Sequence, residues 1–228
     1  MAKAISRASS DGAFSLSKSG VVIASKRARS KANLSRVRSA IASRLTEPVA
    51  GVLARTGLSP DAISWTGFVL ALGAAALIIT GHPFAAGFVV LVAGFFDILD
   101  GALARRVKKV TPFGAVLDST LDRLSEAVVL LAILVLYAQE AAFTPIILAC
   151  LALIGSLLVS YVRARAEGAG LECRVGLFTR GERVVVLALG LLLSHIDYAL
   201  VIALAIIVVF SFFTIVQRLV YAWQQTKR

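Results

Sequence analysis

The chain has 228 residues, of which 58% are hydrophobic and 16% are charged, and its formal net charge is +11. This composition is too apolar for an ordinary water-soluble domain and indicates an integral membrane protein. The two cysteines and two histidines do not have the spacing of a disulfide framework or a zinc site, so neither is expected.

The first 56 residues differ from the rest, because they contain 11 basic and two acidic residues. Residues 1–30 have no long apolar segment and no helical period, so we expect a disordered basic tail and no cleaved signal peptide. In residues 31–56, apolar side chains recur every four positions from Val37 to Leu53 among arginines. This pattern predicts an amphipathic juxtamembrane helix on an anionic membrane surface, kinked at Pro48.

Residues 57–228 are expected to form one membrane domain. A helix needs about 20 apolar residues to cross a bilayer, and six stretches approach that length, the fifth being short. The predicted fold is therefore an all-α integral membrane bundle of six transmembrane helices, preceded by the interfacial helix. The expected spans are 62–80, 83–104, 114–137, 143–164, 184–196 and 198–221.

The positive charges predict the topology of this bundle. The 24 Lys and Arg residues avoid the connections after the first, third and fifth spans. The positive-inside rule then places both termini and the loops at 105–113 and 165–182 in the cytoplasm of a multi-pass protein of the cell (plasma) membrane. Topology and attraction to anionic membrane lipids explain the net charge, so no nucleic-acid partner is expected.

Four aspartates lie at the expected cytoplasmic ends of the second and third spans. An ionised side chain in hydrocarbon costs on the order of 3 kcal/mol or more, so these residues need a reason to be there. Asp97 and Asp100 share one helix face, and Gly114, Asp118 and Asp122 share a face of the next helix. A short basic link predicts that the two helices are antiparallel neighbours whose acidic faces meet.

Carboxylates so close together would repel one another unless cations lie between them. Oxygen ligands suit Mg²⁺, Mn²⁺ or Ca²⁺ better than zinc or copper. Two such ions could clamp a phosphate and stabilise charge on the attacking and leaving oxygens. Gly101 and Gly114 each lie one helical turn from an aspartate, where the missing side chain would let a phosphorylated ligand approach the backbone.

The pattern DxxDGxxAR, eight residues, GxxxDxxxD resembles the signature of the CDP-alcohol phosphotransferase family, and the similarity covers about residues 35–225. The resemblance implies transfer of a phosphatidyl-type group from a CDP-linked lipid to an alcohol, with release of CMP, by a magnesium-dependent enzyme that is usually a homodimer. The signature residues in this sequence are Asp97, Asp100, Gly101, Ala104, Arg105, Gly114, Asp118 and Asp122.

The resemblance also assigns roles by motif position. Asp97, Asp100 and Asp118 would hold the first of two Mg²⁺ ions, for which Mn²⁺ is an alternative. The second ion would bind Asp97, Asp118 and Asp122. Asp122 would also be the general base that takes the proton of the acceptor hydroxyl. The residues implied to bind the CDP-lipid are Pro60, Asp61, Ala62, Ile63, Gly101, Ala104, Arg105, Thr111 and Gly114.

The segment LDSTLDR at 117–123 looks like family members that use inositol phosphate, and SYVRARAEGAGL and TRGER resemble the phosphatidylinositol-phosphate synthase branch of actinobacteria. The predicted substrates are therefore CDP-diacylglycerol and inositol 1-phosphate. An acceptor that carries a phosphate needs cationic partners, because Arg binds phosphate bidentately. The candidates, of which Arg163 and Arg180 are preferred, are Ser160, Arg163, Arg165, Arg180 and Arg183.

Three alternatives stay open on the sequence alone. Glycerol 3-phosphate could replace inositol phosphate as the acceptor, since the same arginines would serve it. An archaeal-type CDP-lipid could replace CDP-diacylglycerol as the donor. A cation transporter also uses carboxylates within the membrane, but here all four aspartates are expected near one membrane face, where they do not form a path across it.

Overall fold

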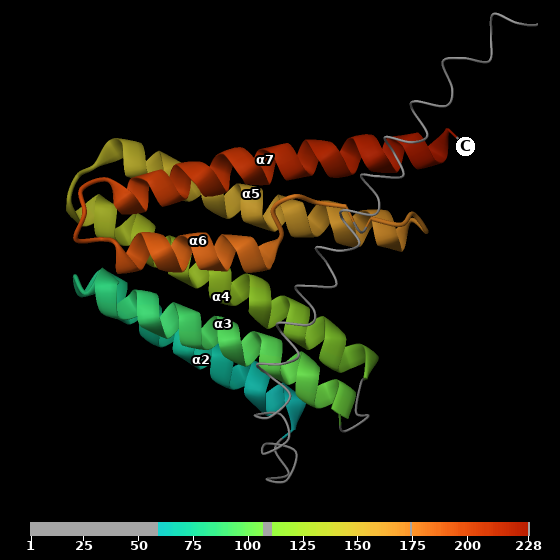
Figure 1. The fold of residues 1–228 in the computed structure, drawn as a ribbon, viewed down its shortest axis with the longest axis horizontal. Helices are drawn as coiled ribbons and strands as arrows, with labels where there is room; N and C mark the ends of the chain where they lie inside the picture. Colours follow the sequence, from blue (N-terminus) through green and yellow to red (C-terminus); the bar gives the residue numbers. More distant parts are fainter. Residues whose placement is uncertain (1–58, 107–110, 174, 228) are drawn as a thin grey trace, which may run out of the picture. The chain divides into compact units, whose positions relative to one another are not determined.

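A computed structural model of the chain describes residues 59–106, 111–173 and 175–227, which belong to one compact unit, Val49–Arg228. The predicted basic tail (1–30) and amphipathic helix (31–56) lie outside the described residues. Within them the chain is all-helical, as predicted (Figure 1). The helices are α2 (Pro60–Ile79), α3 (Pro83–Arg106), α4 (Pro112–Gln139), α5 (Phe143–Gly168), α6 (Arg180–Leu192) and α7 (Ala199–Thr226).

Local signals explain where the helices that carry the site begin. In both α2 and α4 a proline follows the N-cap residue, where its missing N–H costs nothing. Ser59 and Thr111 are these N-caps, and each side chain accepts a hydrogen bond from the backbone N–H three residues later. In α6, the Glu182 side chain accepts a hydrogen bond from the backbone N–H of the N-cap Thr179, at 2.9 Å.

Four of the described helices are long and apolar enough to cross a bilayer: α2, α3 up to Ala104, α5 and α7. Helix α4 has 28 residues, but its first half is charged, with Asp118, Asp122 and Arg123. Helix α6 has 13 residues, about 20 Å at 1.5 Å per residue, against a hydrocarbon core of about 30 Å. Length and composition therefore support four of the six predicted spans.

Large apolar side chains are exposed along the outer faces of the bundle. Val69, Phe88, Phe143, Val209 and Phe213 are each more than half exposed, which is unusual for a protein surrounded by water. Such faces fit contact with lipid chains. Together with the long apolar helices, they identify a multi-pass membrane protein.

The helix packing leaves room between α3 and α4. Helix α2 packs against both of them, α6 packs against α3 and α7, and α5 packs against α4 and α7. Helices α3 and α4 hardly contact each other. The prediction that their acidic faces meet is confirmed, because carboxylate oxygens of Asp97, Asp100 and Asp118 lie within 4.8 Å of one another. The two helices meet through these side chains, and α2 packs on both of them.

Two glycines bring α6 close to α3. A Cβ atom added to Gly87 would lie 2.8 Å from Leu192 Cγ, and one added to Gly94 would lie 3.2 Å from Val184 Cγ1. Any larger side chain would push the two helices apart. Because Gly94 precedes Asp97 by three residues on the same helix, this close packing brings the first residue of α6, Arg180, to Asp97.

Candidate active site

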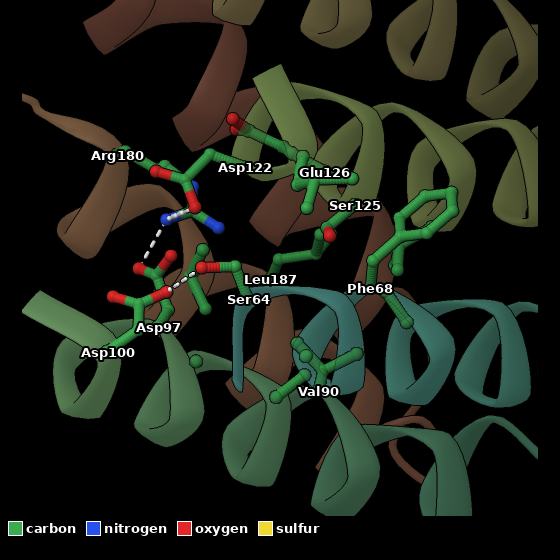
Figure 2. A pocket seen from close by; sticks show the side chains of 17 residues that line it. Ser64, Phe68, Val90, Asp97, Asp100, Asp122, Ser125, Glu126, Arg180 and Leu187 are labelled. Carbon is green, nitrogen blue, oxygen red and sulfur yellow. Dashed lines mark hydrogen bonds and ion pairs between the residues drawn. The ribbon is translucent and has the colours of Figure 1, made fainter. Parts of the chain in front are cut away.

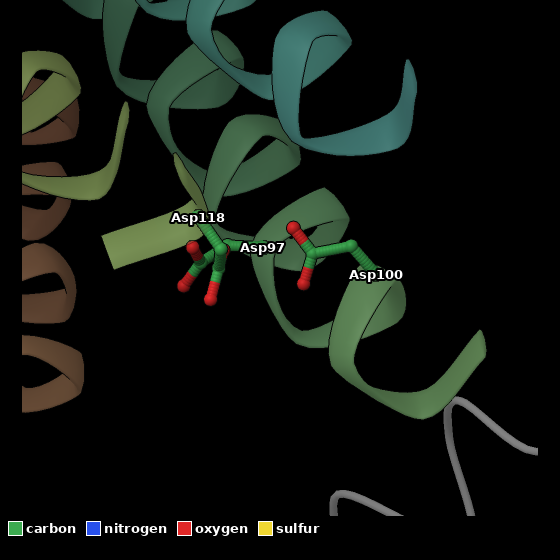
Figure 3. A group of neighbouring side chains, drawn as sticks. All are labelled: Asp97, Asp100 and Asp118. Atoms are coloured by element: carbon green, nitrogen blue, oxygen red, sulfur yellow. The ribbon is translucent and has the colours of Figure 1, made fainter. Parts of the chain in front are cut away.

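Three aspartates from two helices form the acidic centre of the site. Asp97 and Asp100 come from α3 and Asp118 from α4, and one carboxylate oxygen of each lies within 4.8 Å of the others (Figure 3). Asp100 is only 4% exposed, and its Oδ2 accepts a hydrogen bond of 2.6 Å from Ser64 Oγ on α2. Three carboxylates with only oxygen donors fit a hard divalent cation such as Mg²⁺ or Mn²⁺.

The fourth aspartate, Asp122, is held by an arginine of α6. Arg180 Nη1 lies 2.8 Å from Asp122 Oδ1, and the same nitrogen donates a hydrogen bond to Asp97 Oδ2 (Figure 2). All three side chains are about three-quarters buried. Arg180 therefore neutralises one carboxylate from each of α3 and α4, at the edge of the three-aspartate cluster.

A second ion pair joins the same two helices one turn deeper. Arg183 Nε and Nη2 donate hydrogen bonds of 2.6 and 2.9 Å to the two carboxylate oxygens of Glu126. The Arg183 and Glu126 side chains are 1% and 6% exposed, respectively. Glu126 follows Asp122 by four residues and Arg183 follows Arg180 by three. The two ion pairs therefore connect α4 and α6 at positions one helical turn apart.

A pocket opens between α2, α3, α4 and α6. Asp97, Asp122 and Arg180 line its polar side, and Phe68, Val90 and Leu187 are among its apolar residues (Figure 2). We refer to it as the inner pocket. Its charged side could bind a polar group, and the rest of its lining is largely apolar.

A second pocket lies at the N-terminal ends of α2 and α4, and we call it the outer pocket. It shares Ser64 and Asp100 with the inner pocket, so the hydrogen bond between them lies where the two pockets meet. Six of the nine residues predicted to bind the CDP-lipid line the outer pocket: Pro60, Asp61, Gly101, Ala104, Thr111 and Gly114.

The wall of the outer pocket explains why residue 114 is a glycine. A Cβ atom there would lie 2.9 Å from Thr111 Oγ1 and 3.2 Å from Asp61 Oδ1. Thr111 Oγ1 accepts a hydrogen bond of 2.9 Å from the backbone N–H of Gly114. Without a side chain at this position, the α4 N-terminus keeps its cap and lies close to Asp61. Helix N-termini carry partial positive charge, which favours phosphate groups in such a pocket.

Comparison with known proteins decides the family. The family model of CDP-alcohol phosphatidyltransferases matches residues 58–222. The chain belongs to the CDP-alcohol phosphatidyltransferase family. It is therefore an enzyme of this type, a membrane transferase of phospholipid biosynthesis, as the aspartate signature predicted.

Relatives of this phosphatidyltransferase include the archaetidylinositol phosphate synthase of Methanothermobacter thermautotrophicus, 40% identical over 81% of the chain and 91% of the relative. The phosphatidylinositol phosphate synthase of Mycobacterium tuberculosis is 38% identical over 79% of the chain and 86% of the relative. The crystal structure of the latter with CDP-DAG bound has a TM-score of 0.72, at 36% identity, and covers 79% of the chain and 94% of its own. Its structure with manganese and citrate has a TM-score of 0.70, at 35% identity, covering 78% and 88%.

Two of the remaining predicted CDP-lipid residues of the phosphatidyltransferase, Ala62 and Ile63, are not among the described residues that line the outer pocket. Ile63 is 3% exposed and packs with Leu99 and Leu103. The backbone N–H of Ala62 donates to the Ser59 cap. Arg105 lies in α3, but its side chain is outside the described part of the structure.

The predicted acceptor residues divide into three environments. Arg180 lies among the aspartates, and Arg183 is buried against Glu126. Arg163 is 52% exposed and forms a 2.9 Å ion pair with Glu167. Arg165 is also exposed, and Ser160 is half-buried on the same helix, α5.

Ser64 and Arg218 are two polar residues that the sequence analysis missed. Ser64 lies one helical turn after Pro60, so its contact with the aspartates could have been sought from the helical period. Arg218 is 4% exposed within the apolar α7, and its Nε donates a hydrogen bond of 2.9 Å to the Val175 carbonyl. A lone arginine in an apolar helix is itself a signal that the charge has a partner.

Proposed function

We propose that the enzyme transfers the phosphatidyl group of CDP-diacylglycerol to inositol 1-phosphate, giving phosphatidylinositol phosphate and CMP. The observation that carries this proposal is the junction of the two pockets at Ser64 and Asp100, beside the three-aspartate cluster. A donor in the outer pocket and an acceptor in the inner pocket would meet at those carboxylates. The relatives with synthase names support the inositol phosphate acceptor.

The donor set fits two divalent ions, Mg²⁺ or Mn²⁺. Asp97, Asp100 and Asp118 would hold the first ion, and Asp97, Asp118 and Asp122 would reach the second. When bound, such ions neutralise the diphosphate and polarise the phosphorus–oxygen bond that breaks. The manganese in the related M. tuberculosis structure supports a divalent metal requirement.

The outer pocket would bind the CDP part of the donor. Its six lining residues from the predicted set lie around the N-termini of α2 and α4, whose partial positive charge favours the diphosphate. Arg105 would add positive charge, and Ala62 and Ile63 would support the wall next to Pro60. The relative with CDP-DAG bound supports this donor.

The inner pocket would bind the acceptor. Arg180 lines this pocket and is the nearest cation for the acceptor phosphate. Ser160, Arg163, Arg165 and Arg183 are not among its lining residues and stay candidates from the sequence. Asp122 would take the proton of the attacking hydroxyl. The acceptor oxygen then forms a bond to the lipid-bearing phosphorus, the bond from that phosphorus to the CMP oxygen breaks, and CMP leaves with the electron pair.

The membrane arrangement is also part of the proposal. All six helices of 57–228 would span or enter the bilayer, with α4 and α6 carrying their charges inside the bundle. The helix predicted at 31–56 would lie on the membrane surface, and 1–30 would form the basic tail. Both termini and the aspartates would face the cytoplasm at the plasma membrane, in a homodimer.

An acceptor assay tests the proposed reaction. Detergent-purified protein with Mg²⁺ and CDP-diacylglycerol should release CMP when inositol 1-phosphate is added. Asp118→Asn should abolish this release and EDTA should stop it, since both remove the metal site. Turnover with glycerol 3-phosphate but none with inositol 1-phosphate would overturn the acceptor assignment.

The acceptor residues need a test of their own. If Arg163 contacts the acceptor phosphate, Arg163→Ala should raise KM for inositol 1-phosphate far more than KM for CDP-diacylglycerol. Equal changes in both KM values would remove Arg163 from the acceptor site. The same comparison applies to Arg165→Ala.

A second donor is favoured by one specific observation. The 40% identical relative is an archaetidylinositol phosphate synthase. The polar residues of the site would bind the CDP part of the donor, so they do not select between types of lipid chain. An archaeal-type CDP-lipid is therefore the alternative donor. Measuring kcat/KM for both donors at fixed inositol 1-phosphate distinguishes them, because the natural donor should give the higher value.

A further inference from the structure

Arg180 occupies carboxylates that the proposed reaction needs for other partners. Its Nη1 bonds both Asp97 and Asp122, whereas the reaction would use Asp97 for divalent ions and Asp122 as the base. Arg180 Nη1 bonds one oxygen of each carboxylate, Asp97 Oδ2 and Asp122 Oδ1. A divalent ion bound at those oxygens would displace the guanidinium, so the two cations compete for them.

The guanidinium of Arg180 is only partly satisfied where it lies. Its Nε is buried and has no hydrogen-bond partner within the described residues, although Arg has five N–H donors. A second position that satisfies more of them is therefore favourable. The phosphate of an acceptor in the inner pocket, which Arg180 lines, offers bidentate bonding of that kind.

The backbone that carries Arg180 is fixed on three sides, so the exchange needs only a side-chain movement. Arg183 anchors α6 to α4 through both oxygens of Glu126. Glu182 caps the helix at Thr179. The preceding loop is held to α7, where Thr214 Oγ1 accepts a hydrogen bond of 3.2 Å from the backbone N–H of Phe178.

We propose that Arg180 is an exchangeable counter-cation that couples metal binding to acceptor binding. It neutralises Asp97 and Asp122 before these carboxylates bind divalent ions, and it then turns to the phosphate of the acceptor. This inference rests on the proposed function. Because binding linkage is reciprocal, divalent ions and the acceptor should each increase the affinity of the other.

The direct test is the Mn²⁺ affinity of the full-length protein in detergent, measured from free Mn²⁺ by electron paramagnetic resonance. Arg180→Gln removes the competing cation and should bind Mn²⁺ about 5- to 150-fold more tightly than the wild type, the usual range of coupling between sites. Arg180→Lys keeps a charge without the forked geometry and should give an intermediate affinity. Unchanged or weaker Mn²⁺ binding by folded Arg180→Gln would overturn the proposal.

Two controls locate the measured effect. Lys227→Gln removes one positive charge from a side chain that stacks on Trp223, 3.8 Å from its ring centre, and it should bind Mn²⁺ like the wild type. Asp118→Asn should weaken Mn²⁺ binding strongly, since it removes a proposed ligand. If Lys227→Gln raised the Mn²⁺ affinity as much as Arg180→Gln does, the loss of one positive charge anywhere on the protein would explain both results. That outcome would also overturn the proposal.

The second measurement is the affinity for labelled inositol 1-phosphate, determined by equilibrium dialysis with and without Mn²⁺. Wild-type protein should bind the acceptor several-fold more tightly with Mn²⁺, and Arg180→Gln should lose most of this dependence. A dependence that persists in Arg180→Gln would contradict the coupling. If the Mn²⁺ affinities change as expected but no CMP is released with inositol 1-phosphate, the proposed acceptor fails while the exchange at Asp97 and Asp122 stands.

Discussion

Removing one member of the buried Glu126–Arg183 ion pair should lower the free energy of unfolding more than replacing both members together. In Glu126→Leu, the guanidinium of Arg183 would stay 1% exposed without a countercharge. Its Nη1 already has no hydrogen-bond partner among the described residues, so the variant would leave three donor nitrogens unsatisfied in the core. Breaking a buried ion pair in this way typically destabilises a protein by about 3–5 kcal/mol.

Replacing both members should reverse most of that loss. Glu126→Leu with Arg183→Met fills a similar volume without charge and removes the desolvation penalty of both groups. Such replacements range from neutral to stabilising by about 1–4 kcal/mol. The double variant should therefore be more stable than either single variant, although each single change is disruptive.

The assay is equilibrium unfolding in mixed detergent micelles, followed by circular dichroism. The exposed pair Arg163–Glu167, at 2.9 Å and with side chains 52% and 46% exposed, provides a chemically matched control. Glu167→Leu should change the free energy of unfolding by less than about 0.5 kcal/mol, as for other exposed helix pairs. A double variant less stable than Glu126→Leu alone would refute the reasoning, as would equal effects of Glu126→Leu and Glu167→Leu.

Three further changes test the site and its support. Gly114→Ala should lose the Thr111 cap, which lowers the free energy of unfolding by about 0.5–2 kcal/mol, and it should raise KM for CDP-diacylglycerol. The control is Gly73→Ala, since an added Cβ there meets open space. In the same unfolding and kinetic assays this control should be neutral or stabilising. Asp122→Asn should keep nucleotide affinity in a binding assay but lower kcat by about 10²–10⁴-fold, the usual contribution of a general base; an unchanged kcat would exclude that role. Thr214→Val should leave the Phe178 N–H without its acceptor and cost about 1–3 kcal/mol in thermal or chemical unfolding, and stability equal to the wild type would show that this contact does not hold the loop.

The sequence predicted the helices well because each contains a long or moderately long apolar run, and some also begin at a capping residue. The Ser59-Pro60 and Thr111-Pro112 pairs mark the starts of α2 and α4, and the apolar runs give the helix lengths. It also predicted that Asp97, Asp100 and Asp118 come together, since helical spacing fixes which residues share a face. Both inferences depend on interactions within one helix or between helices joined by a short link.

Contacts between distant segments are harder to predict from the sequence. The short link between α3 and α4 predicts that they are neighbours, but it does not predict that α2 packs on both of them. The count of six spans stays a prediction beyond the four helices that length and composition support, because α6 is only 13 residues long. A short helix is possible here because α3 and α7 pack on either side of it, and this cannot be read from the composition of α6.

The arginines show most clearly what periodicity leaves undetermined. Arg180 and Arg183 are three residues apart on one helix, yet one lies among the site aspartates and the other is buried against Glu126. The difference comes from the depth at which α6 enters the bundle. That depth is set by Gly94, which allows close packing on α3, and by the attachment of the preceding loop to α7 through Thr214 and Arg218. Substitutions far along the chain in α7 can therefore alter the charge environment of Asp97 and Asp122 without contacting either residue.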